Sequence, residues 1–152
     1  MNIFVTDSSP LISAQVLPDK HIVKMPLETC QMLAVVFSKW YFNWGDDVLP
    51  KKDGTPYNTQ KGAFRGHPCT VWAAKDECNT AWLIAHGFEL LREYKYRYGK
   101  VHSCDTAMKA AEQVFEKNTG RTIACCKGAT PFAFAGPDEF KHDESIDILT
   151  KY

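Results

Sequence analysis

The apolar and polar positions along the chain predict a series of helices joined by turn-rich segments. The segment SSPLISAQVL begins a helix, with Ser9 as its N-cap and Pro10 in its first turn. A second helix runs from Asp19 to a stop at Gly45, and Pro26 is expected to kink or split it because proline lacks a backbone donor. Helical spacing then continues over 68–98, 104–117 and a short terminal segment, 142–152.

The segments between these helices carry turn formers. Residues 45–66 are rich in Gly, Pro and charged residues, which is typical of a long loop. Residues 2–5 form a short strand or an extended arm, and 130–140 are apolar and turn-rich. With 45% apolar residues, the chain has enough material for a core. The pattern predicts an all-α fold, a compact single domain over 1–152 with three principal helices and a short extended N-terminal arm.

A stripe of polar side chains crosses the most apolar helix. At about 100° per residue, one arc about 80° wide contains His21, Lys24, Glu28 and Gln31. The stripe faces a cleft, with Glu28 at the bottom of a pocket, or it is a solvent face with an ion pair between Lys24 and Glu28. The cleft interpretation makes these four residues candidates for a functional site.

A second, mixed stripe lies on the helical region over 68–98. It consists of Trp72, Lys75, Asn79, Trp82 and His86. These side chains either line the same cleft or form a boundary face with half-buried tryptophan rings. We expect this helical region to pack against the helix that carries Glu28.

The end of that region, EYKYRYGK, interleaves tyrosines with Lys95 and Arg97. This composition suits base stacking and phosphate contact, and it is also found in ordinary helix packing. Charge is balanced over the whole chain, with 18 basic and 18 acidic residues, but 51–128 hold 13 basic and 8 acidic ones. The excess favours an anionic partner, DNA or a nucleotide, bound through this part of the chain. The basic residues of this part of the chain include Lys61, Arg65, Lys95, Arg97 and Lys100.

The remaining composition narrows the class of protein. No apolar run reaches the length of a membrane span and the N-terminus does not resemble a signal peptide, so we expect a cytoplasmic protein with no membrane partner. The six cysteines include the adjacent pair Cys125 and Cys126, which does not readily bridge, and cytosolic thiols stay reduced.

A repeated His-x-Cys spacing, in HPC (67–69) and HSC (102–104), raises the question of a zinc site. No CxxC or HxxxH motif accompanies it. Small buried thiols are the commoner explanation for such cysteines, and we expect no metal and no cofactor.

The order of motifs resembles a known family. The motif DKHIVKMPLE, the GHP that leads into a long aromatic helix, and TPFAFAGPDEF before a short C-terminal helix are similar to phage-type pyrimidine-dimer DNA glycosylases of the endonuclease V type. The resemblance spans nearly the whole chain. It implies an all-helical DNA-binding fold that cleaves the N-glycosidic bond of a damaged pyrimidine and then nicks the abasic strand. If the protein is encoded by a phage, its location is the host cytoplasm.

The resemblance assigns roles to individual residues of this chain. Glu28 and His21 match the Glu and His of the family's first long helix, where the Glu stabilises positive charge on the sugar. The nucleophile is the N-terminal α-amine, here that of Met1, which forms an imine with the sugar. His67 and Pro68 match the family's HP.

Three positions depart from the family pattern. Asn2 disfavours removal of Met1, whereas the family presents a small residue after that removal. Leu27 and Gln31 stand where the family has arginines, and Lys24 offers a substitute amine or cation.

We therefore expect a DNA glycosylase and abasic-site lyase with catalytic Glu28, His21 and Met1 or Lys24. The alternatives are a non-catalytic relative that binds DNA or a nucleotide in the same pocket, and a helical phage accessory protein. The residues expected to contact nucleic acid are Gln31, His67, Trp72, Lys75, Arg65, Lys95 and Arg97.

Overall fold

A computed structural model describes residues 2–44, 49–126 and 129–132, and in these ranges the chain forms helices and no strand. The predicted all-α fold is confirmed. The predicted terminal helix at 142–152 lies outside the described residues. The helices are α1 (Pro10–Gln15), α2 (Asp19–Phe37), α3 (Pro68–Lys75), α4 (Glu77–Tyr98) and α5 (Asp105–Thr119), with 3-10 turns η1 (Asn58–Lys61) and η2 (Ile123–Cys125).

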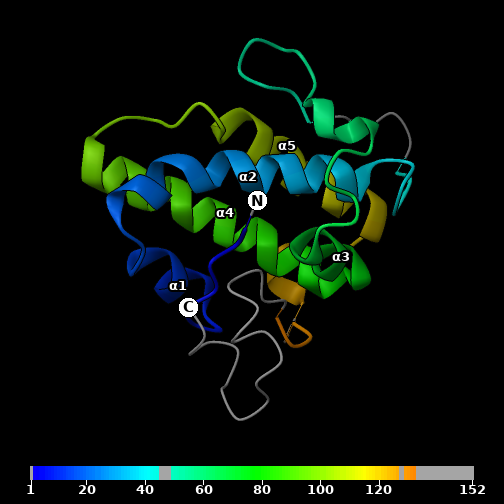
Figure 1. The fold of residues 1–152 in the computed structure, drawn as a ribbon, viewed down its shortest axis with the longest axis horizontal. Coiled ribbons are helices and arrows are strands. Elements are labelled where there is room, and N and C mark those ends of the chain that lie inside the picture. Colours follow the sequence, from blue (N-terminus) through cyan, green and yellow to red (C-terminus); the bar gives the residue numbers. More distant parts are fainter. Residues whose placement is uncertain (1, 45–48, 127–128, 133–152) are drawn as a thin grey trace.

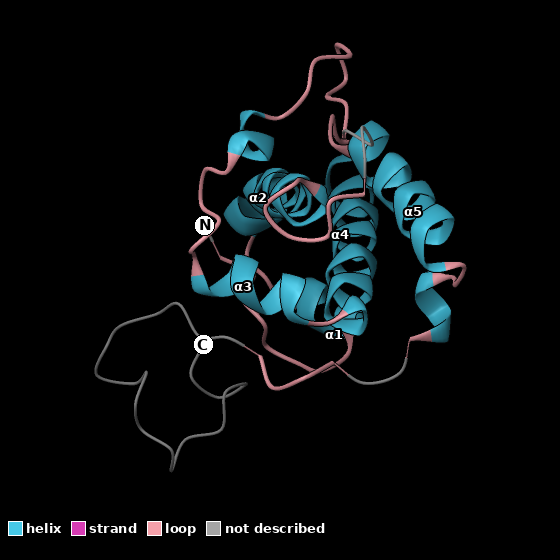
Figure 2. Ribbon diagram, turned by 90° about the vertical axis from the view of Figure 1, so that its right-hand side faces the viewer, coloured by secondary structure: helices cyan, strands magenta, loops and turns pink. Residues whose placement is uncertain are grey.

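Helices α2, α4 and α5 form the centre of the fold (Figure 1). Figure 2 shows α2 nearly end-on beside α4, with α5 on the far side. The three helices meet at Gly87 of α4, where a Cβ atom would lie 2.4 Å from Met108 Cε on α5 and 3.1 Å from Thr29 Cγ2 on α2. The glycine therefore lets the helices approach closely. Among the described residues, no helix is both long and apolar enough to span a bilayer.

Helix α2 is shorter than predicted and is not split. It ends at Phe37 rather than near Gly45, because the Ser38 hydroxyl donates a hydrogen bond to a carbonyl of the last turn and the chain turns back. The Trp44 ring then stacks on Phe37, with ring centroids 5.1 Å apart. Aromatic residues that were expected to extend the helix thus cover its end. The helix runs unbroken through the buried Pro26, so the predicted split is wrong.

The helical region predicted over 68–98 is divided at Asp76. This residue has extended backbone angles (φ −152°, ψ 143°), and its carboxylate accepts a hydrogen bond from the N–H of Cys78 at 2.6 Å. Asp76 is therefore the N-cap of α4. The break frees α3 to pack against α2 as well as α4.

The N-terminal segment is an extended arm followed by α1. Ser9 caps α1 as predicted, since its hydroxyl accepts a hydrogen bond from the N–H of Ile12. The buried hydroxyl of Ser13 accepts a hydrogen bond from the N–H of Thr6 at 3.1 Å and joins the arm to the helix.

Arg97, near the end of α4, fastens the opposite end of α1. Its guanidinium donates hydrogen bonds to the carbonyl oxygens of Leu17 at 2.8 Å and Gln15 at 3.0 Å. It also forms ion pairs with Glu93 at 2.9 Å and Asp19 at 3.0 Å. The Gln15 carbonyl is at the end of α1 and lacks a partner within the helix, and the Leu17 carbonyl lies in the turn that follows, so Arg97 supplies donors to both.

His86 of α4 is fully buried against the same N-terminal segment. Its Nδ1 lies 3.3 Å from the carbonyl oxygen of Pro10, and its ring stacks on Trp82 with centroids 4.9 Å apart. Burial lowers the pKa of His86 to about 4, because the charged imidazolium loses its hydration.

Replacing His86 by Gln is expected to flatten the dependence of stability on pH. The folded-state pKa of about 4 lies below the ordinary 6.5, so stabilisation that is complete above about pH 6.5 is lost as the pH falls toward about 4. In this window the wild type should lose up to about 1.4 kcal/mol per pH unit more than His86→Gln. Urea unfolding of both proteins measures the difference, and parallel curves would contradict the prediction.

Arg97→Ala is expected to lower the free energy of unfolding by about 1–3 kcal/mol, because the carbonyls of Gln15 and Leu17 lose a charged donor. Arg92→Ala is the matched control on the same helix. The Arg92 side chain is 71% exposed and forms an ion pair with Glu89, so its removal should cost under about 1 kcal/mol. Denaturant unfolding compares the two variants, and equal losses would show that Arg97 does not secure α1.

Candidate active site

Glu28 of α2 is a buried carboxylate covered by the N-terminal arm. The residue is 7% exposed, and its Oε1 accepts a hydrogen bond from the backbone N–H of Asn2 at 3.1 Å. A carboxylate removed from water needs such donors, since burial without a partner is costly. Lys24 is exposed, and no ion pair joins it to Glu28 within the described ranges. Glu28 therefore does not belong to a solvent face.

The arm is shaped by the side chain of Asn2. Its Oδ1 accepts hydrogen bonds from the N–H groups of Ile3 at 2.7 Å and Phe4 at 3.0 Å. This local turn is accompanied by a left-handed backbone at Phe4, with φ of 56°. Asn2 thus bends the chain so that its own backbone nitrogen points toward Glu28.

His21, one of the polar stripe residues, also meets the arm. The Phe4 ring packs edge-on against the imidazole, with centroids 4.6 Å apart. The imidazole Nδ1 is buried and has no hydrogen-bond partner among the described residues. His21 and Glu28 therefore contact neighbouring residues of the same extended segment.

The start of α3 closes another side of the site. Cys69 is fully buried, and its thiol donates a long hydrogen bond of 4.0 Å to Asn2 Oδ1. Burial, together with the negative charge of Glu28, raises the pKa of Cys69 to about 11. Cys69 is consequently a neutral thiol near neutral pH and is not suited to act as a nucleophile. His67 caps α3 through its Nδ1, which accepts a hydrogen bond from the N–H of Cys69 at 3.1 Å.

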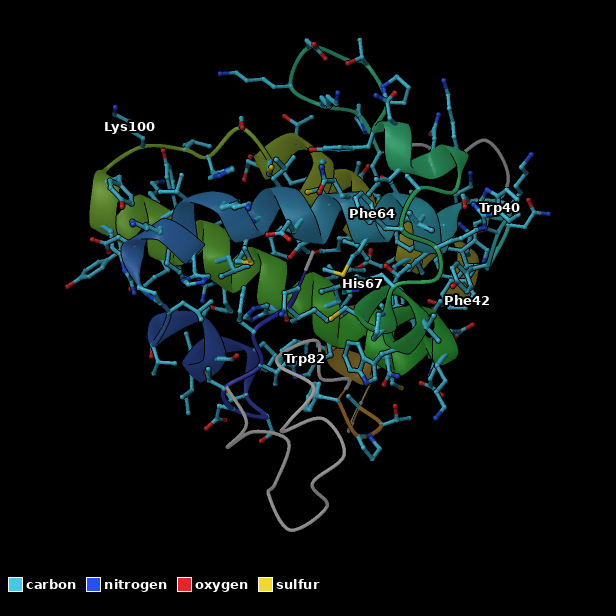
Figure 3. The ribbon with its side chains drawn as sticks, in the orientation of Figure 1. Trp40, Phe42, Phe64, His67, Trp82 and Lys100 are labelled. Atoms are coloured by element: carbon cyan, nitrogen blue, oxygen red, sulfur yellow. The ribbon has the colours of Figure 1, made fainter. Side chains whose placement is uncertain are left out.

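A loop connects these residues to the far end of the polar stripe. The Thr59 hydroxyl in η1 donates a hydrogen bond to the carbonyl oxygen of Gln31 at 2.8 Å. The chain then continues through Arg65 to His67 at the start of α3, and Figure 3 shows His67 on this loop beside α2. Asn2, Glu28 and Cys69 thus form the centre of the site, with Gln31 and His67 on its loop side.

The second polar stripe has a different role. The expected packing of α2 against the elements that carry it, α3 and α4, is confirmed. However, Trp72 is 4% exposed and donates its indole N–H to the carbonyl oxygen of Thr130 at 3.3 Å. Trp82 donates to the carbonyl oxygen of Ser8 at 2.8 Å. The two tryptophans of the stripe therefore form hydrogen bonds with other segments of the chain. Lys75, at the end of α3, is exposed.

The cations predicted to contact DNA lie at two ends of the molecule. The Arg65 guanidinium stacks 4.3 Å from the ring centroid of Trp40, on the loop side. Lys95 is exposed near the end of α4, close in sequence to Lys100, which Figure 3 shows at the opposite end of the view from Trp40. Arg97 is bound to α1 and α2. The structure therefore does not gather these cations around Glu28.

The His-x-Cys repeat has a local explanation. In both copies the histidine Nδ1 accepts a hydrogen bond from the cysteine N–H, at 3.1 Å from His67 to Cys69 and 3.0 Å from His102 to Cys104. Each copy thus forms a turn directly before a helix. Across the described ranges, no group of three or more His, Cys, Asp or Glu side chains is arranged to hold a metal ion.

Sequence reasoning missed the contribution of Asn2 to the site. The sequence pattern identified Asn2 only as a residue that disfavours removal of Met1. The usable signal was the tendency of Asn to accept hydrogen bonds from the N–H groups that follow it, which marks a turn.

The comparisons with known proteins bear on the part of the chain that holds this site. The family model for pyrimidine dimer DNA glycosylases matches residues 1–106, which contain the arm and helices α1 to α4. No curated protein and no solved structure matches the chain. The matched region covers more than half of the 152 residues and agrees with the resemblance of the motifs. The chain therefore belongs to the pyrimidine dimer DNA glycosylase family.

Proposed function

We propose that this protein is a DNA glycosylase and abasic-site lyase that acts on a damaged or modified pyrimidine, with Glu28 as the assisting carboxylate. One observation carries the proposal: the backbone nitrogen of Asn2 is 3.1 Å from the buried Glu28 carboxylate. It brings the start of the chain, where a primary amine is expected, next to a negative charge. Family membership supplies the reaction class.

Glu28 is suited to stabilise the positive charge that develops on the sugar. When the bond between C1′ and the base breaks, C1′ and the ring oxygen share a positive charge. A carboxylate shielded from water attracts that charge more strongly than an exposed one. Glu28 combines low exposure with a fixed orientation, since Asn2 holds one of its oxygens.

The proposed nucleophile is a primary amine at the start of the chain. We assign this role to the α-amine of Met1, and removal of Met1 would convert the Asn2 nitrogen itself into the amine. The neutral amine forms a bond to C1′ while the bond from C1′ to the base breaks, and the base leaves with the bonding electrons and takes up the amine proton. Opening of the sugar ring, with protonation of its oxygen, leaves a protonated imine. Lys24 is the alternative amine.

The imine accounts for strand cleavage. It makes the C2′ proton acidic, and loss of that proton expels the 3′-phosphate. For DNA contacts near the site we assign Gln31, His67 and Arg65, which lie on the loop side. We assign no DNA contact to Trp72 or Arg97, because each forms hydrogen bonds within the protein. We assign none to Lys75 or Lys95, which lie near the ends of α3 and α4.

Glu28→Gln is expected to reduce single-turnover cleavage of DNA containing a pyrimidine dimer by at least about 100-fold, because the amide carries no charge. The fold and the affinity for DNA should be retained, since the amide oxygen can still accept the hydrogen bond from Asn2. Cleavage, DNA binding and thermal unfolding are measured on the same preparation.

Glu116→Gln, on α5, is the control for loss of a carboxylate and should cleave like the wild type. Unchanged cleavage by Glu28→Gln would remove the catalytic assignment. DNA binding without cleavage by the wild type would instead identify a non-catalytic relative.

Borohydride reduction during incubation with abasic DNA is expected to trap a covalent adduct, because reduction converts the imine into a stable amine. Mass spectrometry should place the adduct on the N-terminal peptide, and Lys24→Gln should still form it. An adduct on the peptide that contains Lys24 would move the nucleophile to that side chain. Absence of any adduct would contradict the lyase mechanism.

A further inference from the structure

Two cysteines and a tyrosine meet in the core. Cys30 of α2 is fully buried, Cys104 directly precedes α5 and is 3% exposed, and Tyr57 precedes η1. The Cys30 thiol donates a hydrogen bond to the Cys104 sulfur. The Tyr57 hydroxyl donates a second one to the same sulfur, over 3.8 Å. We call these three residues the thiol cluster, and Cys104 Sγ is its shared acceptor.

The thiol cluster favours a negative charge on Cys104. The hydrogen bond from Cys30 lowers the pKa of Cys104 well below its ordinary value, although burial opposes the change. Cys104 is also the N-cap of α5, and the N-terminus of a helix attracts negative charge. The same hydrogen bond, together with burial, raises the pKa of Cys30, and burial raises that of Tyr57. Cys104 is therefore the member of the cluster that ionises, and the thiolate is the form of cysteine that reacts with oxidants.

A cavity of about 360 Å³ opens to solvent at Cys104. Its charged lining residues are Lys51, Lys52 and Asp53. The lysines add positive charge, and Lys51 Nζ lies 5.7 Å from the centre of the Tyr57 ring. The Asp53 carboxylate accepts hydrogen bonds from the N–H and the hydroxyl of Thr55, so it is held by its own turn. A water molecule takes up about 30 Å³ of the liquid, so the cavity has room for a small oxidant such as hydrogen peroxide.

Cys69 shows that a His-x-Cys turn before a helix does not by itself produce such a thiol. Cys69 and Cys104 both follow a histidine that accepts a hydrogen bond from the cysteine N–H. At Cys69, however, burial and the charge of Glu28 raise the pKa to about 11. The two copies of the motif differ in their surroundings, because Cys104 has a second thiol, a hydroxyl donor and a cavity with lysines, whereas Cys69 faces a carboxylate.

We propose that Cys104 is a modification site for peroxides and that Cys30 resolves the oxidised sulfur, which gives a reversible disulfide between α2 and the start of α5. Because Cys30 is fully buried, it meets the oxidant through Cys104 rather than directly. The inference is independent of the proposed function. Cys30 is two positions from Glu28 and about 200° around α2 from it, so the disulfide forms on the opposite face of the helix from the proposed active site.

The reaction consumes one peroxide and oxidises both thiols. The Cys104 thiolate attacks one peroxide oxygen, so an S–O bond forms while the O–O bond breaks, and the departing oxygen takes up a proton. The Cys30 sulfur then attacks the sulfenic acid of Cys104. An S–S bond forms, the S–O bond breaks, and the hydroxide leaves as water with the Cys30 proton. Two electrons pass from the sulfurs to the peroxide, and a thiol reductant such as dithiothreitol reverses the oxidation of the protein.

The test maps the cysteines of the wild type during titration with hydrogen peroxide. The protein is first reduced and freed of reductant, and after each addition the remaining thiols are alkylated in denaturant before digestion and mass spectrometry. We expect the first oxidised product to be a pair of peptides joined through Cys30 and Cys104, and dithiothreitol should restore both thiols. The Cys104 thiol should be lost at least about 10-fold faster than the Cys69 thiol, which is the matched control.

Two variants separate the attacking thiol from the resolving thiol. In Cys30→Ala the sulfenic acid of Cys104 has no partner, so dimedone, which traps sulfenic acids, should label Cys104. In Cys104→Ser the buried Cys30 should stay reduced at the peroxide concentration that oxidises the wild type. Cys78→Ser, which removes a thiol outside the cluster, should form the disulfide like the wild type. Since the map is made on the wild type, it decides the inference even if a variant fails to fold.

The other thiols define the outcomes that overturn the inference. Cys78 and Cys126 also share a hydrogen bond, and burial raises the pKa of Cys126 to about 11. A first disulfide between Cys78 and Cys126, or loss of the Cys104 thiol no faster than that of Cys69, overturns the peroxide site. A wild type in which dimedone labels Cys104 while Cys30 stays reduced overturns the resolving role. No measurement uses DNA, so none of these results bears on the glycosylase proposal.

Discussion

The hydrogen bond between the Asn2 backbone and Glu28 is the constraint around which the proposed site is organised. A buried carboxylate in a helix surrounded by apolar residues is tolerated only with a donor nearby. The extended arm provides that donor, and Asn2 bends to provide it. The Glu28 carboxylate and the arm consequently fix each other's position. The buried Cys69 packs against the site from the start of α3.

Helix α4 is the scaffold that makes this arrangement possible. Its polar and aromatic positions hold α1 and the segments on either side of it rather than lining the site. Trp82 donates a hydrogen bond to the carbonyl oxygen of Ser8, and the His86 ring lies beside the carbonyl oxygen of Pro10. Arg97 donates hydrogen bonds to carbonyl oxygens at and just after the end of α1. Because α1 follows the arm directly, these contacts also limit where the arm can lie. A stripe that resembles a binding surface thus contributes to the site from a distance.

The parts of the structure that sequence predicts well are those decided locally. Ser9 and Pro10 mark a helix start by their own chemistry, and the spacing of His21, Glu28 and Gln31 follows from helical period. The predicted end of α2 is wrong because the chain reverses after Phe37, where Ser38 bonds to the last turn and Trp44 stacks on Phe37. The apolar pattern continues through this reversal and gives no sign of it. In the same way, the helical spacing continues across Asp76, so the pattern predicts one helix where this residue ends α3 and caps α4.

Prediction of the site was limited in the same way. Glu28 could be selected by periodicity, but its partner Asn2 is 26 positions away and lies in an arm without any period. Whatever chemical group precedes Asn2 is joined to the nitrogen that faces Glu28. An affinity tag fused ahead of the chain therefore lies next to the proposed reactive centre and blocks the amine that we propose as nucleophile, so under that mechanism a folded preparation with such a tag is inactive. Fusions made at the other end of the chain leave that nitrogen unaltered.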